Sequence, residues 1–297
     1  MCKMLGLVSN LETYIGPSYE ILVRILRQLC EGGDCHGDGS GFAWYGANGW
    51  DVKKTEKPLW ESKELGSFIA YTRSVAMIIH ARRSSYPAIS LQGPRVDNSH
   101  PFLAELFGFK WVFAHNGAVD FRDDLYRLSV KDKVLEYRGR VYKLESYGID
   151  SEIFFRILLH TIEELGEEEP KSVPAALRRM LTSDMFRRIH ALNFIMGSNK
   201  YLYAFRFCDE KYAEAGKYSL YYLKRTGLSE AGRILLRRPN EANLIISSEP
   251  FTSDKWIGVA REIKKDLPTE EWIPLENGEI LIVPIGKPDK ATKEAVL

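Results

Sequence analysis

The order of the apolar segments along the chain limits the folds that it can adopt. Strand-length apolar runs occur in the first part of the chain, at residues 4–9, 42–45, 77–81 and 110–114. Two amphipathic stretches of helical period then begin near Ser151 and Ser172. Further strand-like runs follow at residues 194–196, 201–207, 219–223, 244–247, 256–260 and 280–283. Because helices and strands do not alternate regularly, the pattern predicts an α+β fold in which helices cover the faces of sheets.

Turn and cap residues locate several more elements. Ser18 is a candidate N-cap for a further helix with apolar side chains at helical spacing. Asn48-Gly49 is a strong signal for a hairpin between the two apolar runs that flank it. Arg138-Gly139 predicts a second hairpin within residues 135–144, and the prolines and glycines of residues 84–101 predict a loop.

Composition excludes several classes of protein. The 297 residues carry a formal net charge of +1 and 45% of them are hydrophobic, which is ordinary for a globular chain. The charge gives no sign of a nucleic-acid or membrane partner. No apolar run approaches the roughly 18 residues of a membrane span, and the start of the chain does not resemble a secretory signal. We therefore expect a cytoplasmic protein.

The four cysteines are few for this length and predict a reduced, intracellular chain. Cys30, Cys35 and Cys208 are expected to be ordinary buried or partly exposed residues. The histidines and cysteines show no spacing typical of a zinc site, so no metal is predicted.

Cys2 is different because of its place next to the initiator methionine. If Met1 is removed, one residue carries both a thiol and a free α-amine. An α-amine titrates near pH ~8 and a thiol near ~8.5, so both groups are poised close to neutral pH. An adjacent base activates a weak nucleophile. A cysteine at any single position is more often inert than catalytic, so the role of Cys2 has to be inferred from the other motifs of the chain.

Two polar segments follow or precede predicted strands in the first half of the chain. Residues 37–41 form a glycine-rich stretch that is either a flexible turn or a wall where backbone approaches a ligand. Residues 80–85 end a buried strand and contain Arg82, whose planar fork suits a carboxylate. The alternative for this arginine is ordinary surface charge.

Two further segments lie at comparable positions later in the chain. His115-Asn116-Gly117 ends a buried strand and is either a simple turn or an oxyanion hole built from an amide and a backbone N–H. Asp150 and Ser151 open a helix, where one of them is expected to be the N-cap. A carboxylate at this point could instead hold the ammonium group of a substrate.

Together and in this order, the motifs resemble those of the class II glutamine amidotransferases, a group of N-terminal-nucleophile hydrolases. The matching pieces are Cys2, Gly37-x-Gly39-Ser40-Gly41, His80-x-Arg82, Asn98-Ser99-His100-Pro101, His115-Asn116-Gly117, Asp150-Ser151-Glu152, Ser248-Glu249-Pro250-Phe251 and Trp272-Ile273-Pro274. The resemblance covers nearly the whole chain and is strongest to the stand-alone members. It implies a four-layer αββα sandwich and a single domain over residues 1–297.

The resemblance also implies catalytic roles. Cys2 would be the nucleophile, its α-amine the general base, and Asn116 with Gly117 the oxyanion hole. The reaction would be hydrolysis of the γ-amide of glutamine or of a γ-glutamyl compound through a thioester, with release of glutamate and of ammonia or an amine. No cofactor is implied.

Four residues would bind the substrate. Arg82 would bind the α-carboxylate of glutamine and Asp150 the α-ammonium group. Ser85 would line the carboxylate site, and His100 completes the set. Two departures stand out: Ser40 replaces a tryptophan common in stand-alone relatives, and residues 122–147 carry a hairpin that is either a lid or an insertion.

The sequence is consistent with three hypotheses about the function. The chain could be a glutaminase subunit that feeds ammonia to a separate synthase. It could cleave a γ-glutamyl bond in a small metabolite. It could also bind glutamine without catalysis as a sensor or scaffold, a reading that retention of Met1 would favour because a blocked amine cannot act as a base.

Overall fold

Two large antiparallel sheets form the centre of the molecule. The computed structural model describes residues 2–84, 89–122, 124–212, 218–226, 240–250 and 271–297. In the order in which they pair, the strands of the first sheet are β14 (Ile273–Pro274), β12 (Tyr221–Thr226), β13 (Ala242–Ser247), β1 (Lys3–Tyr14), β4 (Arg73–Ala81), β2 (Ser40–Gly46) and β3 (Gly49–Thr55). Those of the second are β16 (Thr292–Ala295), β15 (Glu279–Pro284), β11 (Tyr201–Phe205), β10 (Phe186–Gly197), β6 (Phe109–Phe121) and β5 (Phe102–Leu106).

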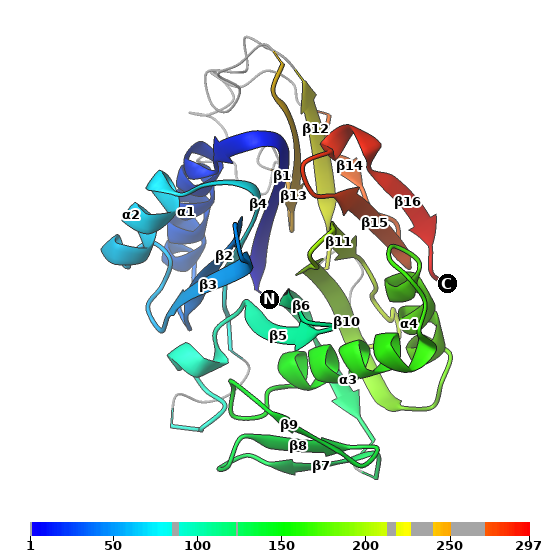
Figure 1. Cartoon of the computed structure of the whole chain (residues 1–297). Helices are drawn as coiled ribbons and strands as arrows, with labels where there is room; N and C mark the ends of the chain where they lie inside the picture. The colour runs from blue at the N-terminus through cyan, green and yellow to red at the C-terminus, as the bar shows by residue number, and fades with distance from the viewer. Residues whose placement is uncertain (1, 85–88, 123, 213–217, 227–239, 251–270) are drawn as a thin grey trace.

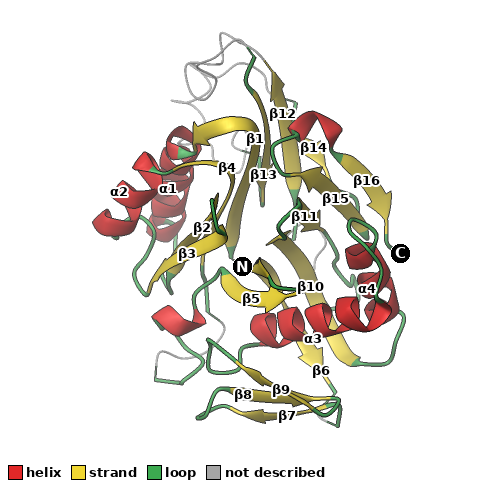
Figure 2. Cartoon of the chain, viewed as in Figure 1, coloured by secondary structure: helices red, strands yellow, loops and turns green. Residues whose placement is uncertain are grey.

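Helices cover the outer faces of both sheets. Helices α1 (Gly16–Glu31) and α2 (Lys63–Tyr71) pack on the first sheet, and α3 (Asp150–Leu165) and α4 (Ser172–Leu181) pack on the second. Figures 1 and 2 show the two helix pairs on opposite sides of the strands. The expected four-layer αββα sandwich is therefore confirmed.

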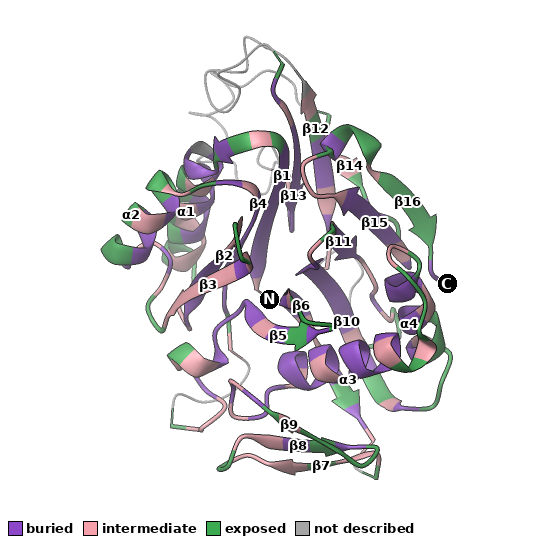
Figure 3. Cartoon of the chain, viewed as in Figure 1, coloured by how far each residue is buried: buried purple, intermediate pink, exposed green. Residues whose placement is uncertain are grey.

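Side chains of adjacent residues on β1 enter different cores. Leu5 and Leu7 pack against α1 and α2, whereas Met4 and Val8 pack against the second sheet. All four side chains are fully buried, as the purple colour of β1 in Figure 3 shows. A strand buried on both faces has a continuous apolar sequence instead of an alternating one, which explains the run at the start of the chain.

A small third sheet lies beside the end of α3. It consists of β7 (Tyr126–Ser129), β8 (Val134–Tyr137) and β9 (Arg140–Lys143), and its turn at Arg138-Gly139 has positive φ at both residues. Leu135 and Tyr137 belong to the same core as α3. The hairpin expected within residues 135–144 is thus confirmed, together with a third strand that the sequence did not predict.

The two N-cap predictions are wrong. The N-cap of α1 is Ile15, and Ser18 lies inside the helix. The N-cap of α3 is Ile149, so neither Asp150 nor Ser151 caps it. Neither N-cap residue makes a side-chain capping hydrogen bond, and the Asp150 carboxylate accepts from the backbone nitrogen of Val119 instead. The strand expected at residues 256–260 lies outside the described residues.

Among the helices of the described residues, none has the length and apolar character needed to cross a membrane.

Gly197 lets the edge of the first sheet approach the second. A Cβ at this position would collide with the ring of Trp50, whose Nε1 donates to the carbonyl of Ser198 at 2.7 Å. We predict that Gly197→Ala lowers the free energy of unfolding by about 1–3 kcal/mol because the buried indole cannot move aside. The measurement is urea unfolding followed by circular dichroism.

Gly32→Ala is the matched control. Gly32 ends α1 with φ −82°, and the nearest atom to an added Cβ would be 3.5 Å away. Its free energy of unfolding should change by less than about 1 kcal/mol. Equal stability of the two variants would contradict the packing argument.

Candidate functional site

The start of β1 is fixed by the residues that follow β13, its neighbour in the first sheet. Lys3 and Glu249 form a buried ion pair with Nζ and Oε1 2.6 Å apart. Met4 N donates to Ser248 Oγ at 2.9 Å, and Ser248 N donates to the carbonyl of Met4 at 3.1 Å. The Ser248-Glu249 motif therefore holds the residues that follow Cys2 in place. β1 begins near the middle of the molecule in Figure 1.

Cys2 lies between the ends of the two sheets. Its backbone nitrogen donates to Asn116 Oδ1 at 2.9 Å. Its half-buried Sγ is 3.5 Å from the backbone nitrogen of Arg83, which donates to it, and 3.7 Å from the carbonyl of the same residue. The structure thus brings the predicted nucleophile to the predicted oxyanion amide. Arg83 is a contact that the sequence did not reveal, because only its backbone is involved.

Asn116 and Gly117 lie on β6, opposite Asn193 and Leu192 of β10. Because Asn116 Oδ1 accepts from Cys2, the amide presents its Nδ2 end as a donor. A side chain at Gly117 would collide with the carbonyl of Ala191, so only glycine fits beside the irregular pairing of β6 with β10.

Burial raises the pKa of the Cys2 thiol above its usual value. The hydrogen bond from the Arg83 backbone and the charge of Arg82 lower this pKa, whereas Asp150 raises it further. The net effect keeps the thiol protonated at neutral pH, so that formation of the thiolate requires a nearby base.

Arg82 follows β4 and its guanidinium is buried among backbone carbonyls. Nη1 donates to the carbonyl of Gly93 at 3.1 Å, and Nη2 donates to the carbonyl of Gln92 at 3.0 Å. Nη1 also lies 3.4 Å from the carbonyl of Asp38, whose side chain accepts from Ser84 N at 2.7 Å. Asp38 belongs to the glycine-rich segment 37–41, for which the sequence allows either a flexible turn or a wall of the site.

Asp150 is the first residue of α3 and is tied to the strand that carries Asn116. Its Oδ2 accepts from the backbone nitrogen of Val119 on β6 at 2.9 Å. The hydroxyl of Ser151 lies 3.4 Å from its Oδ1. The charge of Asp150 acts on the Cys2 thiol, so the two predicted site residues lie in one electrostatic environment.

Three buried histidines, His80, His100 and His115, lie near the part of β6 that carries Asn116. His80 Nε2 donates to the carbonyl of His115 at 3.0 Å. His115 Nε2 donates to the carbonyl of Ala191 at 3.3 Å and its Nδ1 accepts from Ser151 Oγ at 2.9 Å. Burial lowers the pKa of all three rings, that of His80 to about 3, so they are neutral and support the strand before Asn116.

Of the two remaining predicted site residues, the structure describes His100 but not Ser85. The His100 ring packs between His80 and Phe102, with centroids 4.2 Å and 4.6 Å away. It is 2% exposed, and its nitrogens have no hydrogen-bond partner among the described residues. Ser85 lies outside the described residues, so its role stays a prediction.

The expectation for Cys30 and Cys35 was wrong. The two residues form a disulfide, whereas Cys2 and Cys208 form none. They lie five positions apart in the sequence, and the Gly32-Gly33 turn after α1 brings them together. Asp34 inside this short loop forms an ion pair with Arg83, next to the Cys2 thiol.

A cavity of about 330 Å³ lies apart from these residues. It is lined mainly by Leu106, Phe107, Phe109, Trp111 and Ile162, with Glu167 and Glu168 at its rim. These residues surround the C-terminal end of α3, whereas Asp150 stands at its N-terminal end.

The comparison with protein families agrees with this geometry. The family described as glutamine amidotransferases class II matches residues 1–296. The chain belongs to this family. Escherichia coli YafJ, provisionally assigned as a glutamine amidotransferase, is 26% identical over 69% of this chain and 72% of its own length. The Saccharomyces cerevisiae protein named probable glutamine amidotransferase DUG3 is 25% identical over 92% of this chain and 78% of its own.

Solved structures share the fold at low identity. Glutamine phosphoribosylpyrophosphate amidotransferase from Bacillus subtilis aligns with a TM-score of 0.59 and 15% identity over 100% of this chain. A predicted glutamine amidotransferase from Pseudomonas aeruginosa aligns with a TM-score of 0.55 and 20% identity, over 96% of this chain and 98% of its own. The sandwich is thus of the N-terminal-nucleophile hydrolase type.

The chain spans only part of some of these relatives. It covers 49% of the Bacillus subtilis amidotransferase and 62% of a Haemophilus influenzae relative that is 24% identical over 69% of this chain. What the remaining parts of those proteins do is therefore not carried over to this chain.

The neutral histidines predict acid sensitivity. Their pKa in the folded chain lies below the usual 6.5, so the unfolded chain binds more protons once the pH falls below that value. Stability is therefore complete above about pH 6.5 and is lost below it, by about 1.4 kcal/mol per pH unit for each such histidine. Urea unfolding at a series of pH values measures this slope.

His100→Phe isolates one of these contributions. The ring position is retained and no hydrogen bond among the described residues is lost, so the slope should fall by about one histidine's share, about 1.4 kcal/mol per pH unit. His190→Phe, at a half-exposed position on β10, is the control. An unchanged slope in His100→Phe would show that this ring is protonated in the folded chain.

Proposed function

We propose that this protein hydrolyses the γ-amide of glutamine, or of a γ-glutamyl compound, through a thioester on Cys2 once Met1 has been removed. One observation carries the proposal: Cys2 N lies 2.9 Å from Asn116 Oδ1 while the thiol of the same residue lies against the backbone of Arg83. The proposed nucleophile, the nitrogen that would become its base and the proposed oxyanion amide thus lie close together, which supports the proposal. Family membership supports the same chemistry.

The first half of the reaction forms the thioester. The α-amine of Cys2 takes the thiol proton, and the sulfur attacks the amide carbonyl carbon. Asn116 Nδ2 and the Gly117 N–H stabilise the negative oxygen of the tetrahedral intermediate. The resulting α-ammonium returns its proton to the leaving nitrogen, so ammonia or an amine departs.

The second half repeats these steps with water. The α-amine takes a proton from water, the hydroxide attacks the thioester, and the same oxyanion donors act again. Collapse of the intermediate releases glutamate and returns the thiol. Because burial raises the thiol pKa, the α-amine must act within the site instead of relying on thiolate formed in bulk water.

Arg82 and Asp150 are proposed to recognise the two ends of the substrate's α-carbon. The Arg82 guanidinium already donates to the carbonyls of Gln92 and Gly93. A substrate carboxylate would compete with these neutral acceptors, and it has the advantage because charge-assisted bonds are roughly twice as strong. Asp150 would hold the α-ammonium group. We further propose that residues 1–297 act as one amidotransferase domain, with ammonia passing to a separate synthase or to solvent.

The three alternative functions predict different substrates and products. A glutaminase subunit should prefer free glutamine, whereas a stand-alone hydrolase should prefer larger γ-glutamyl amides. A sensor should bind glutamine without releasing glutamate even after Met1 is removed. Glutamate release from a γ-glutamyl panel, together with the intact mass of untagged protein, distinguishes the three.

We predict that Cys2→Ala abolishes glutamate release from glutamine because no other group can form the thioester. The small side chain at the start of β1 should leave the unfolding temperature nearly unchanged. Cys208→Ala is the control, since Cys208 is the other cysteine outside the disulfide among the described residues and is buried. Activity of Cys2→Ala close to that of the unsubstituted protein would end the proposal.

We predict that Arg82→Lys raises KM for glutamine about tenfold or more, because an ammonium group cannot replace a planar fork that bonds a carboxylate through two nitrogens. Steady-state kinetics of glutamate release measures it. Arg140→Lys, on the exposed edge strand β9, is the matched control. An unchanged KM in Arg82→Lys would mean that the carboxylate binds elsewhere.

A further inference from the structure

The two proposed substrate anchors come from different layers of the sandwich. Arg82 follows β4 in the first sheet, whereas Asp150 begins α3 on the far side of the second. A substrate that uses both anchors requires them at a fixed spacing. The segments that fix this spacing are residues 91–98, ending in the short helix Val96–Asn98, and residues 145–149 just before α3.

Asn98 joins these two segments through its side chain. Nδ2 donates to the carbonyls of Leu91 and Gly93, each at 2.8 Å, and Oδ1 accepts from the backbone nitrogen of Tyr147 at 3.0 Å. Asn98 is 0% exposed. Gly93 is the residue whose carbonyl also accepts from Arg82 Nη1 at 3.1 Å. One amide thus connects the Arg82 environment to the approach to Asp150.

Gln92 makes a second connection beside the first. Its Nε2 donates to the carbonyl of Gly148 at 3.1 Å, and its own carbonyl accepts from Arg82 Nη2 at 3.0 Å. Gly148 is two residues before Asp150. Both guanidinium Nη atoms are therefore linked to the loop that positions the carboxylate, Nη2 through Gln92 alone and Nη1 through Gly93 and Asn98.

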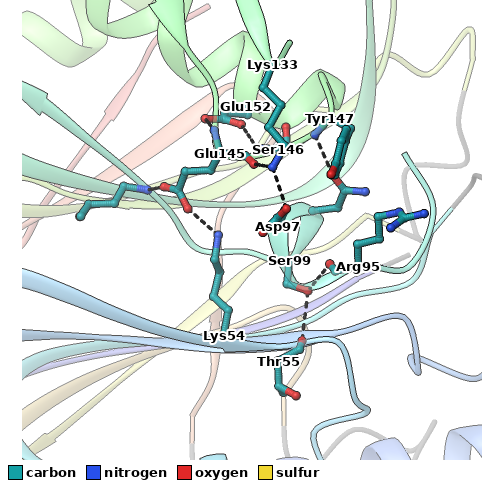
Figure 4. Close-up of polar contacts among 12 residues, drawn as sticks. Lys54, Thr55, Arg95, Asp97, Ser99, Lys133, Glu145, Ser146, Tyr147 and Glu152 are labelled. Atoms are coloured by element: carbon teal, nitrogen blue, oxygen red, sulfur yellow. Dashed lines mark hydrogen bonds and ion pairs between the residues drawn. The ribbon is translucent and has the colours of Figure 1, made fainter. Parts of the chain in front are cut away.

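The far end of this connection is rigid because Glu152 anchors it. Glu152 is 0% exposed, and its carboxylate accepts from the backbone nitrogens of Glu145 and Ser146 at 2.9 Å and 2.7 Å. Arg156 Nη2 donates to the same carboxylate at 2.9 Å. Figure 4 shows Glu152 directed at this turn of backbone.

Lysines attach the same turn to its neighbours. Lys54 on β3 donates to Glu145 Oε2 at 2.6 Å. Lys133 Nζ donates to Asp97 Oδ2 at 2.7 Å and to the carbonyl of Glu145 at 2.9 Å, so it bridges the 91–98 and 145–149 segments from the side of the third sheet (Figure 4). Residues 145–149 are therefore held on several sides, and a change in Asn98 or Gln92 displaces mainly the Arg82 side.

We propose that Asn98 and Gln92 are positioning residues that set the spacing between Arg82 and Asp150, and that they thereby make the site specific for substrates carrying both an α-carboxylate and an α-ammonium group. The inference rests on the proposed function. It follows that loosening this connection weakens binding only for substrates that use both anchors. A γ-amide with one charged end does not need the spacing.

The test compares glutamine with glutaramic acid, the monoamide of glutaric acid, which has the same amide and carboxylate but no amino group. The measured quantity is the ratio of kcat/KM for glutamine to that for the analogue. Asn98→Asp keeps the acceptor for Tyr147 but turns a carboxylate towards the carbonyls of Leu91 and Gly93. We expect the ratio to fall about tenfold, through KM for glutamine, with kcat little changed.

Gln92→Leu is the milder second variant, because it removes one donor at a half-buried position and leaves the backbone carbonyl that Arg82 uses. It should lower the ratio in the same direction, and it carries the test if Asn98→Asp does not fold. Asn10→Asp is the matched control: Asn10 also bridges two backbone groups, of Asn240 and Ala242, but at an exposed position well along β1. Its ratio should equal that of the unsubstituted protein.

The outcomes separate this inference from the function on which it rests. If the unsubstituted protein releases no glutamate after Met1 removal, the proposed function fails, and the ratio of dissociation constants for the two ligands then tests the spacing by calorimetry. If it is active and folded Asn98→Asp and Gln92→Leu both keep its ratio, the positioning role is overturned. A general loss of fold would lower both kcat/KM values together and leave the ratio unchanged.

Discussion

The hydrogen bond from Cys2 N to Asn116 Oδ1 joins the two sheets at the candidate site, and the rest of the architecture makes it possible. Cys2 directly precedes β1 of the first sheet and Asn116 lies on β6 of the second, so the bond forms only if the sheets meet at a fixed distance. Gly6 helps to set that distance, since an added Cβ would lie 3.2 Å from Ile195 on β10. The apolar layer between the sheets thus determines the geometry of a polar site at its edge.

Burial determines which groups of this site are charged and which are neutral. The same desolvation that raises the thiol pKa of Cys2 keeps His80, His100 and His115 neutral. The positive charges of the N-terminal amine and of Arg82 lower the pKa of the thiol, and the charge of Asp150 opposes them. Removal of Met1 would leave an α-amine on Cys2, and this amine would be the nearest group able to accept the thiol proton. The chemistry of the proposed site therefore depends on that removal.

The sequence predicted those parts of the fold that local physics decides. The apolar run at residues 4–9 has the composition of a strand buried on both faces, and Asn48-Gly49 and Arg138-Gly139 are turns that few other conformations allow. Asp150 misled because a side chain able to cap a helix can serve another partner, here the backbone nitrogen of Val119. Ser18 misled because the helix begins two residues before it, at Gly16. The disulfide was not predicted because so few cysteines in a chain of this length favour a reduced protein, and the turn that brings Cys30 and Cys35 together is visible only in the fold.

The order of motifs indicated which residues gather at the site, but it carried no information on how they are held there. Asn98 was visible only as one position in a motif, and Gln92 in no motif at all. Both act on backbone carbonyls and nitrogens of distant segments, and such groups are the same whatever the local sequence. A role of this kind depends on which backbone lies opposite the side chain. It follows that residues which set the spacing of a site can be recognised only once the layers of the fold are assembled.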